Sequence, residues 1–346
     1  MSPSDRRRLG MGMAILLFLG SAGVALTAPR PPRRSLAVQD LGMLDGTSTQ
    51  GTAINDLGQI VGVALAGNLW SSFLWESGAM SDVGPGLRVD INNQGQILLQ
   101  TQVGNPEDMN ACFLLQGQTL TDLGVPQGWQ CHATDLNDAG LVVGSLSQAG
   151  GGLSVTRAFL WSAGTFTDLG SLGGDVTLAM RVNERGQVVG AAMTPSGYEH
   201  AFLWEAGAMT DLGTPGAPWS RATAINDRGQ VLVQSGAHVH VWEAGVMRDL
   251  GTMGAPDTPA QVTIPLDLNE RGQILVAVED AQTHLFRYGI WSAGRLMPLP
   301  SLGSGRPSAV RLNERGQAVG SDRADDESPW HLALFTTVVA RGNRAR

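Results

Sequence analysis

A short sequence unit recurs along this chain, and this repetition constrains the fold more than any other feature. Each copy contains an Asn-x-x-Gly element, then Phe-Leu-Trp-x-x-Gly and then Met-x-Asp-Leu-Gly, or close variants of them. The element occurs seven times, at Asn55, Asn92, Asn137, Asn183, Asn226, Asn269 and Asn313. Successive Asn residues are 37, 45, 46, 43, 43 and 44 residues apart. Such a period is the sequence signature of a repeat architecture, such as a propeller or a solenoid.

The residue pattern inside the unit predicts β-strands. β-Branched and aromatic residues alternate with turn residues, and the repeats lack a long apolar stripe with helical spacing. The first unit predicts four strands, at Gly51–Asn55, Gln59–Ala64, Ser72–Glu76 and Ala79–Val83. A four-stranded unit that repeats at this length is typical of a propeller blade. Open β-solenoids are the alternative, although their repeats are usually shorter.

The Asn-x-x-Gly element is interpreted as a turn between the first two strands. An Asn side chain can accept a hydrogen bond from its own backbone two residues on, and Gly can adopt positive φ without a steric penalty. A calcium loop would need alternating oxygen ligands. Copies such as Asn183-Glu184-Arg185-Gly186 do not supply them, so the element is expected to be structural.

The two ends of the chain predict how the array closes. Ser35–Gly42 is a lone copy of the fourth strand, without the first three before it. The seventh unit has its third strand, Leu332–Thr336, but lacks the Asp-Leu-Gly strand that should follow. We therefore expect an all-β, seven-bladed propeller over residues 35–340, closed by the amino-terminal strand, with a tail at 341–346. Closure would remove an exposed sheet edge.

Aromatic side chains recur once per unit on the third strand and are expected to pack between neighbouring sheets. These positions are Trp75, Trp161, Trp204, Trp242 and Trp291, with Leu115 and Phe335 at the equivalent places. Three histidines share the register four residues earlier: His200, His238 and His331. Because repeated units lie apart around a ring, these histidines do not predict a shared metal ion. We expect neither a metal nor a cofactor.

The fourth strand ends in a repeated Asp, at Asp82, Asp122, Asp168, Asp211 and Asp249. Five carboxylates spread over five units do not form an acid/base pair. We expect each one to bond nearby backbone at a turn.

The amino terminus predicts export. Arg6, Arg7 and Arg8 precede an uncharged stretch from Leu9 to Ala28. Residues 1–28 are read as a signal peptide or as an uncleaved single-span anchor, and 29–34 as an extended Pro/Arg linker. An extracellular, envelope or periplasmic location is therefore expected, with membrane contact only through this segment if it stays uncleaved.

Charge is unevenly distributed along the chain. From residue 35 on, 17 Arg stand against 30 acidic residues, a formal charge of −13. An acidic body argues against nucleic acid as a partner, because phosphate backbones need basic surfaces. Two cysteines, Cys112 and Cys131, lie 19 residues apart. In an exported protein they either form one disulfide or remain as two buried thiols.

One face of the predicted ring is a candidate binding surface. The turns that join strands one to two and three to four share one face, whereas the longer and more variable loops lie on the other. Four tryptophans outside the periodic positions fall in or beside these loops: Trp70, Trp129, Trp219 and Trp330. We predict that they bind a ligand, with Arg221, Arg323, Asp325 and Asp326 as polar companions, because rigid aromatics make good contact surfaces. The alternative is that they fold over the loops and cover the core.

The units resemble the HAF repeat, a family of extracellular bacterial repeats. The resemblance is carried by Ala-Ile-Asn-Asp-x-Gly-Gln-Val-Val-Gly, His-Ala-Phe-Leu-Trp and Met-Thr-Asp-Leu-Gly, and it covers nearly all of residues 36–336. The fourth unit shows it best, at Asn183, Gly186, Gln187, Gly190, His200, Ala201, Phe202, Trp204 and Asp211. The second and sixth units depart most. The resemblance implies export and a repeat fold, and it brings no functional residues.

Three classes of function follow from these observations. The first is a binding module for an envelope polysaccharide or a surface protein. The second is a hydrolase or lyase on a propeller scaffold, although no nucleophile elbow, paired-carboxylate motif or His-rich metal motif is present. Only Glu107, Asp108 and His132 could meet on the loop face. The third is a structural envelope protein. Acids with Arg or His in the central channel would favour the enzyme, and small apolar residues there would favour binding or structure.

Overall fold

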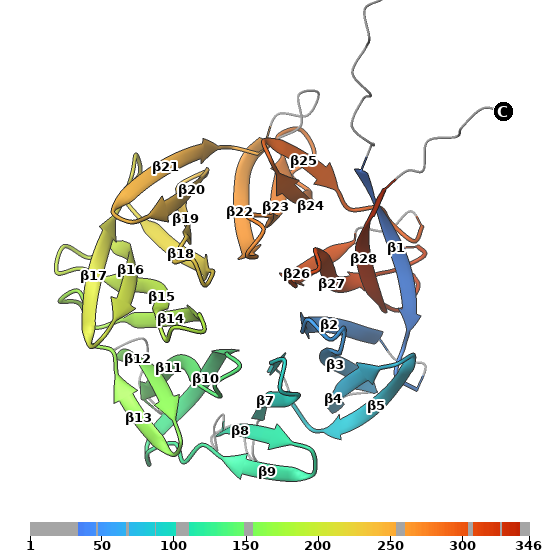
Figure 1. Cartoon of the computed structure of the whole chain (residues 1–346), viewed down its shortest axis with the longest axis horizontal. Helices are drawn as coiled ribbons and strands as arrows, with labels where there is room; N and C mark the ends of the chain where they lie inside the picture. The colour runs from blue at the N-terminus through green and yellow to red at the C-terminus, as the bar shows by residue number, and fades with distance from the viewer. Residues whose placement is uncertain are drawn as a thin grey trace, which may run out of the picture.

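The chain folds into a ring of seven four-stranded antiparallel sheets, shown in Figure 1. The computed structural model describes residues 34–45, 48–66, 69–86, 88–101, 111–148, 155–253, 260–303, 307–325 and 327–339. The predicted signal or anchor segment at 1–28 and the tail at 341–346 lie outside these ranges. Among the described residues, no helix is long and apolar enough to cross a bilayer.

Each sheet is one blade. Blade one contains β2 (Ser48–Ile54), β3 (Ile60–Ala66), β4 (Leu69–Glu76) and β5 (Ala79–Gly84). Blade two contains β6 (Arg88–Ile91), β7 (Gln96–Thr101), β8 (Ala111–Gln116) and β9 (Thr119–Asp122). Blade three contains β10 (Trp129–Leu136), β11 (Val142–Gln148), β12 (Thr156–Ser162) and β13 (Thr165–Asp168). Blade four contains β14 (Thr177–Val182), β15 (Val188–Met193), β16 (Glu199–Glu205) and β17 (Ala208–Gly213).

The remaining blades follow the same order. Blade five contains β18 (Ser220–Ile225), β19 (Val231–Ser235), β20 (His238–Glu243) and β21 (Val246–Gly251). Blade six contains β22 (Ala260–Leu268), β23 (Ile274–Asp280), β24 (Phe286–Ser292) and β25 (Arg295–Pro298). Blade seven contains β26 (Ser308–Leu312), β27 (Gln317–Asp322), β28 (His331–Val339) and β1 (Arg34–Gly42). The predicted all-β propeller is confirmed.

Blade seven closes the ring as predicted. β1 pairs antiparallel with β28, from Arg34 opposite Val339 to Gly42 opposite Leu332. The two ends of the described chain therefore lie side by side at the outer edge of this blade (Figure 1). Arg34, assigned to the linker from the sequence, belongs to β1.

The repeated turn has the predicted conformation. The seven Gly residues of the Asn-x-x-Gly elements have φ between 68° and 87°. In the first turn, the side-chain Oδ1 of Asn55 accepts hydrogen bonds from the backbone N–H groups of Leu57 and Gln59. The Asn therefore holds its own turn, and the absence of a side chain on Gly permits the positive φ.

The same Asn residues also join the blades, which the sequence analysis missed. Each side-chain Nδ2 donates to the backbone oxygen of the repeat Asn in the next blade. The series runs through all seven blades, and Asn313 returns to Asn55 O at 3.1 Å. A second series joins the residues that directly follow each repeat Asn. The backbone N–H of each such residue donates to the side-chain oxygen of the equivalent residue in the next blade, and this series also closes into a ring. We call these two hydrogen-bonded rings the collar.

The apolar core lies between the blades. One cluster combines Ile60 and Phe73 of blade one with Leu332 of blade seven, and Trp75 packs against it. At the equivalent places Trp161, Trp204 and Phe335 are buried. The periodic aromatic residues therefore pack between sheets, as expected.

The repeated Asp residues hold turns, as expected. The carboxylates of Asp82, Asp122, Asp168, Asp211 and Asp249, and of Asp40 in β1, each accept a hydrogen bond from the N–H of the Gly two residues later.

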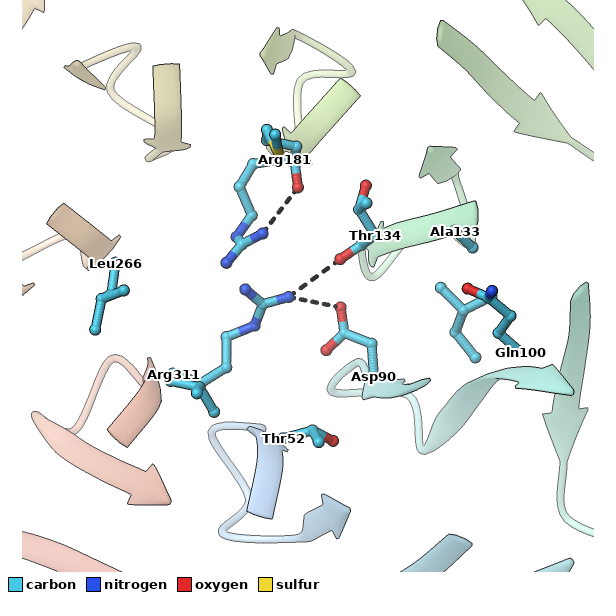
Figure 2. A pocket seen from close by; sticks show the side chains of 11 residues that line it. Thr52, Asp90, Gln100, Ala133, Thr134, Arg181, Leu266 and Arg311 are labelled. Carbon is cyan, nitrogen blue, oxygen red and sulfur yellow. Dashed lines mark hydrogen bonds and ion pairs between the residues drawn. The ribbon is translucent and has the colours of Figure 1, made fainter. Parts of the chain in front are cut away.

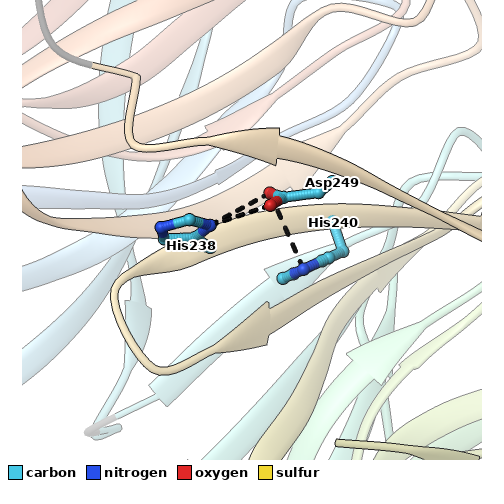
Figure 3. A group of neighbouring side chains, drawn as sticks. All are labelled: His238, His240 and Asp249. Carbon is cyan, nitrogen blue, oxygen red and sulfur yellow. Dashed lines mark hydrogen bonds and ion pairs between the residues drawn. The ribbon is translucent and has the colours of Figure 1, made fainter. Parts of the chain in front are cut away.

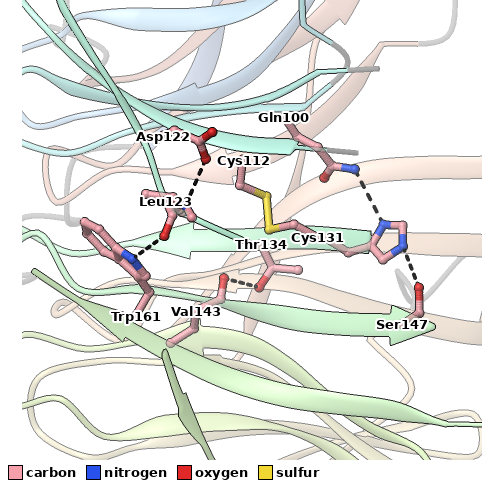
Figure 4. The surroundings of a disulfide bond; sticks show 11 residues. Gln100, Cys112, Asp122, Leu123, Cys131, Thr134, Val143, Ser147 and Trp161 are labelled. Carbon is pink, nitrogen blue, oxygen red and sulfur yellow. Dashed lines mark hydrogen bonds between the residues drawn. A yellow bond between two sulfur atoms is a disulfide. The ribbon is translucent and has the colours of Figure 1, made fainter. Parts of the chain in front are cut away.

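The cysteines form a disulfide that crosses a blade boundary. Cys112 lies on β8 of blade two and Cys131 on β10 of blade three, with their Cα atoms 6.0 Å apart (Figure 4). Of the two possibilities left open by the sequence, the structure therefore has the bridge. Both residues are fully buried in a cluster that Trp129 also contacts.

Candidate functional site

Around the central channel lies a ring of seven residues, five of them charged, that the sequence analysis did not identify. It occupies the position two residues before each repeat Asn, on the first strand of each blade. The seven residues, in blade order, are Ala53, Asp90, Asp135, Arg181, Ala224, Asp267 and Arg311. We call them the channel ring. The signal was present in the sequence: five charged residues occupy a repeat position that is Ala in the other two units.

A local irregularity of the first strands helps to line the channel. In six of the seven blades the register with the second strand shifts immediately before the channel-ring residue. A bulge of this kind leaves one residue unpaired and changes the direction of its side chain. Five such residues line the channel cavity: Thr52, Thr134, Met180, Leu266 and Val310.

The cavity has a volume of about 340 Å³ and a mixed lining (Figure 2). Asp90, Arg181 and Arg311 of the channel ring line it together with Gln100 and the bulge residues. This volume is at the lower end of the range of about 300 to 1,000 Å³ that is usual for small-molecule sites.

Arg311 spans the channel. From blade seven, its Nη2 donates to Asp90 Oδ2 of blade two at 3.2 Å. The same nitrogen donates to Thr134 O and to Asp135 Oδ1 of blade three, each at 3.2 Å. One guanidinium nitrogen therefore brings two carboxylates together from different blades.

Arg181 approaches from the opposite side, and its side chain has fewer partners. Its Nη1 donates to Met180 O at 2.8 Å, and its Nε lies 3.8 Å from Asp135 Oδ1. Figure 2 shows the guanidinium groups of Arg181 and Arg311 extending toward each other across the cavity. The buried carboxylate of Asp135 lies near both cations and moderates their repulsion.

The channel-ring carboxylates also accept hydrogen bonds from neighbouring backbone. Asp135 Oδ2 accepts from Val182 N, and Asp267 Oδ2 accepts from Leu312 N, both at 2.8 Å and both in the next blade. Burial raises the pKa of Asp267 to about 7. Burial and the neighbouring Asp90 carboxylate raise the pKa of Asp135 well above its usual value.

The tryptophans predicted to bind a ligand lie apart around the ring. Trp70 is in blade one at the start of β4, Trp129 in blade three at the start of β10, Trp219 directly before β18 of blade five, and Trp330 directly before β28 of blade seven. All four are on the predicted loop face. Trp70 is 38% exposed and the other three are half-buried. None of the four lines the channel cavity, and their role as a binding surface stays a prediction.

The predicted polar companions already have protein partners. Arg221 forms a bidentate pair with Glu199, at 2.6 and 2.9 Å. The Arg323 guanidinium lies 4.8 Å from the ring centroid of Trp330. Asp325 accepts hydrogen bonds from Glu327 N and Ser328 N.

The residues suggested for a loop-face catalytic group are only partly visible. Residues 107 and 108 lie outside the described ranges, as does residue 326, one of the predicted polar companions of the tryptophans. His132 Nε2 lies 3.3 Å from Ser147 Oγ, and its Nδ1 lies 3.5 Å from Gln100 Nε2.

One group in the described part of the chain has the composition of a metal site. His238, His240 and Asp249 lie on the outer strands of blade five, and their candidate ligand atoms are within 4.8 Å of one another.

Comparison with known proteins supports the fold. No protein family matches the sequence, and no curated protein is detectably similar to it, so the resemblance to the HAF repeat stays a prediction. The β-propeller domain of the Trilobed protease from Pyrococcus furiosus aligns with a TM-score of 0.60 at 9% identity, over 84% of this chain and 95% of that one. That domain has an open velcro topology, whereas β1 closes the ring here.

Two further solved structures have the same architecture. YCF48 from Cyanidioschyzon merolae aligns with a TM-score of 0.51 at 11% identity, over 87% of this chain and 98% of that one. The acylaminoacyl peptidase of Pyrococcus horikoshii aligns with a TM-score of 0.57 at 10% identity, over 84% of this chain. The chain spans about half, 52%, of that peptidase. At these identities the similarity concerns the fold alone.

Proposed function

We propose that this protein is an exported binding module that holds a small polar ligand, such as a sugar unit of an envelope or extracellular polysaccharide, in its central channel. The observation that carries the proposal is the channel cavity, where Arg181 and Arg311 face each other beside Gln100. Guanidinium and amide groups recognise hydroxyl and carboxylate groups, and the Leu266 and Val310 side chains supply apolar contact.

Location outside the cytoplasm belongs to the same proposal. The basic and apolar amino-terminal pattern favours export, and the resemblance to the HAF repeat implies it. The Cys112–Cys131 disulfide adds support, because such bonds persist mainly in oxidising compartments. Fractionation of cells that express the full-length protein tests this, and recovery in the cytosol with two reactive thiols would contradict it.

The binding proposal is tested with an array of neutral and acidic glycans, followed by calorimetry on each positive ligand. We expect one saturable site per chain. Arg181→Ala should weaken binding by about tenfold or more, because a hydrogen bond to a charged group contributes about 1.5 to 3 kcal/mol. Arg315→Ala, an exposed substitution in a collar turn, is the matched control.

The loop-face tryptophans provide a competing location for the same function. A variant with Ala at Trp70, Trp129, Trp219 and Trp330 should bind the channel ligand with unchanged affinity if the channel is the site. Loss of binding in this variant together with normal binding by Arg181→Ala would move the site to the loop face. If neither the glycan array nor a pull-down with cell-wall material detects binding, the proposal is wrong.

A hydrolase or lyase that acts on extracellular glycans is the second candidate, and a specific observation favours it. The channel contains acids with Arg, which is the arrangement that favours an enzyme. Asp90 and Asp135 share one guanidinium nitrogen, and the raised pKa of Asp135 suits a proton donor. Binding ranks first because both carboxylates also accept backbone hydrogen bonds, from Ile91 N and Val182 N.

Release of reducing ends or unsaturated products from each bound glycan separates the two candidates. The binding proposal predicts no turnover. Turnover that is abolished by Asp135→Asn, with ligand binding retained, would establish the enzyme instead.

A further inference from the structure

Blade five departs from the repeat at one buried position. In blades one to four, the third-strand residue opposite the repeated Asp is Phe: Phe73, Phe113, Phe159 and Phe202. In blade five this residue is His240, directly opposite Asp249. His238 precedes it by two residues, so both imidazoles lie on the same side of β20. The metal expectation from the sequence considered histidines of different blades and overlooked this pair within one strand.

A purely structural role explains the pair of His238 and Asp249 but does not explain His240. The distance from His238 Nδ1 to Asp249 Oδ2 is 2.9 Å, and the same 2.9 Å separates His200 from Asp211 and His331 from Asp40. This His–Asp pair is therefore a cross-strand feature of three blades. His240 is the additional residue, because Phe202 and Ala333 are its counterparts in the other two blades.

His240 is buried without a hydrogen bond from the described residues. The residue is 3% exposed, and its Nδ1 has no hydrogen-bond partner. Its Nε2 lies 3.6 Å from Asp249 Oδ1, which is longer than a hydrogen bond. An imidazole buried in this way costs free energy that a Phe would not, so its presence needs an explanation.

The positions of the three side chains suit a metal ion (Figure 3). The two imidazoles lie on the same side of Asp249, and the candidate ligand atoms are all within 4.8 Å of one another. Donor atoms around a tetrahedral ion with bonds of about 2.0 to 2.1 Å lie about 3.4 Å apart. The distances of 2.9 and 3.6 Å to the Asp249 carboxylate lie on either side of this value.

Access to the group is also suitable. A cavity of about 580 Å³ borders the group, lined by the tight turn at Gly236 and Ala237 and by Pro215. The side chains of His238 and Asp249 are 47% and 51% exposed.

We propose that His238, His240 and Asp249 bind one divalent transition-metal ion of the zinc class on blade five. Two imidazoles and one carboxylate are a common ligand set for Zn²⁺. Three protein ligands leave a fourth position directed toward the cavity, where water or a donor group of a ligand binds. An exchangeable ion is therefore expected, in contrast to a structural ion enclosed by four protein ligands.

Calorimetric titration of the chelator-treated, tag-free protein with Zn²⁺ tests the proposal. We expect one ion per chain. His240→Phe, which installs the residue of blades one to four, should weaken binding by at least about tenfold, because even the loss of an outer-shell partner costs about 10- to 100-fold. Asp249→Asn should weaken it similarly while its remaining oxygen still accepts from Gly251 N. His200→Ala in blade four is the matched control and should leave the affinity unchanged.

A second measurement keeps the test decisive if a variant unfolds. Co²⁺ bound to the wild-type protein should give the visible absorption of a low-coordinate site and lose it when an equivalent of Zn²⁺ is added. Absence of saturable binding by the wild-type protein, or an equal affinity in the folded His240→Phe variant, would overturn the proposal.

Discussion

The collar Asn residues and the channel ring lie only two residues apart, one in the turn after the first strand of each blade and the other on that strand, yet they are built in opposite ways. In the collar every blade contributes the same Asn, and each link joins adjacent blades. In the channel ring the residue varies from Ala to Asp to Arg, and Arg311 of blade seven contacts blades two and three. The comparison teaches that the repeat Asn, which is identical in all units, forms the scaffold, whereas the channel-ring position, which differs between units, carries the chemistry specific to this chain.

The largest expected change in the free energy of unfolding comes from a substitution in the collar. Asn313→Ala removes four hydrogen bonds, including the one to Asn55 O that completes the ring. At about 1 kcal/mol per bond, the free energy of unfolding should fall by about 4 kcal/mol. Urea unfolding measures this, with exposed Arg315→Ala of the same turn as the control. A loss no larger than that of the control would break the distinction between the two rings.

Loss of the disulfide should have the next largest effect on the free energy of unfolding, because the bridge joins blades two and three covalently. Replacing Cys112 and Cys131 with Ser should lower the free energy of unfolding by about 3 kcal/mol, the value expected for a loop of this length. Urea unfolding of the wild-type protein with and without reductant provides a second measurement. Detection of two reactive thiols in the unreduced, denatured protein would show that the bridge is absent.

The channel ring should make stability depend on pH. Burial raises the pKa of Asp267 from 3.8 to about 7, so the folded state holds this proton more tightly than the unfolded state. Stability from this group is therefore complete below the unfolded pKa and is lost as the pH rises toward the folded one. Between about pH 5 and about pH 8 the loss amounts to between about 2 and about 3 kcal/mol. Asp267→Asn should reduce the decline measured by urea unfolding, and an unchanged decline would contradict this assignment.

The smallest expected effect on stability belongs to Arg181. Its side chain is hydrogen-bonded only to Met180 O among the described residues, and its contact with Asp135 is 3.8 Å long. Arg181→Ala, which installs the residue of blades one and five, should change the free energy of unfolding by less than about 1 kcal/mol. Ligand affinity should nevertheless fall. A large loss of stability would make Arg181 part of the scaffold.

Much of the fold could be predicted because turns and strands depend mainly on residues that are close together in the sequence of one unit. The Asn-x-x-Gly turns, the four strands and the missing fourth strand of the last unit all follow from patterns within single units. The structure only moves the ends of some strands, so that the first strand of blade one spans Ser48–Ile54 instead of the predicted Gly51–Asn55.

The channel ring could not be predicted in the same way. Alternation along a regular strand assigns each side chain to one face, but the register shift before Arg311 and its counterparts changes that assignment. The contact of Arg311 with Asp90 also joins residues 221 positions apart, which no unit-by-unit comparison can show. The sequence analysis missed His240 because it considered only the His position that recurs in three units, which is His238 in blade five. His240 occupies a position that is Phe in blades one to four.

The pairing of β1 with β28 imposes an order on biosynthesis. β1 must wait for β28, because β28 is its only partner in the described sheet and is synthesised after all six other blades. Blades one to six can assemble as they emerge from the ribosome, but blade seven is complete only after β28 has been made. A product truncated before β28 therefore leaves β1 without its partner strand.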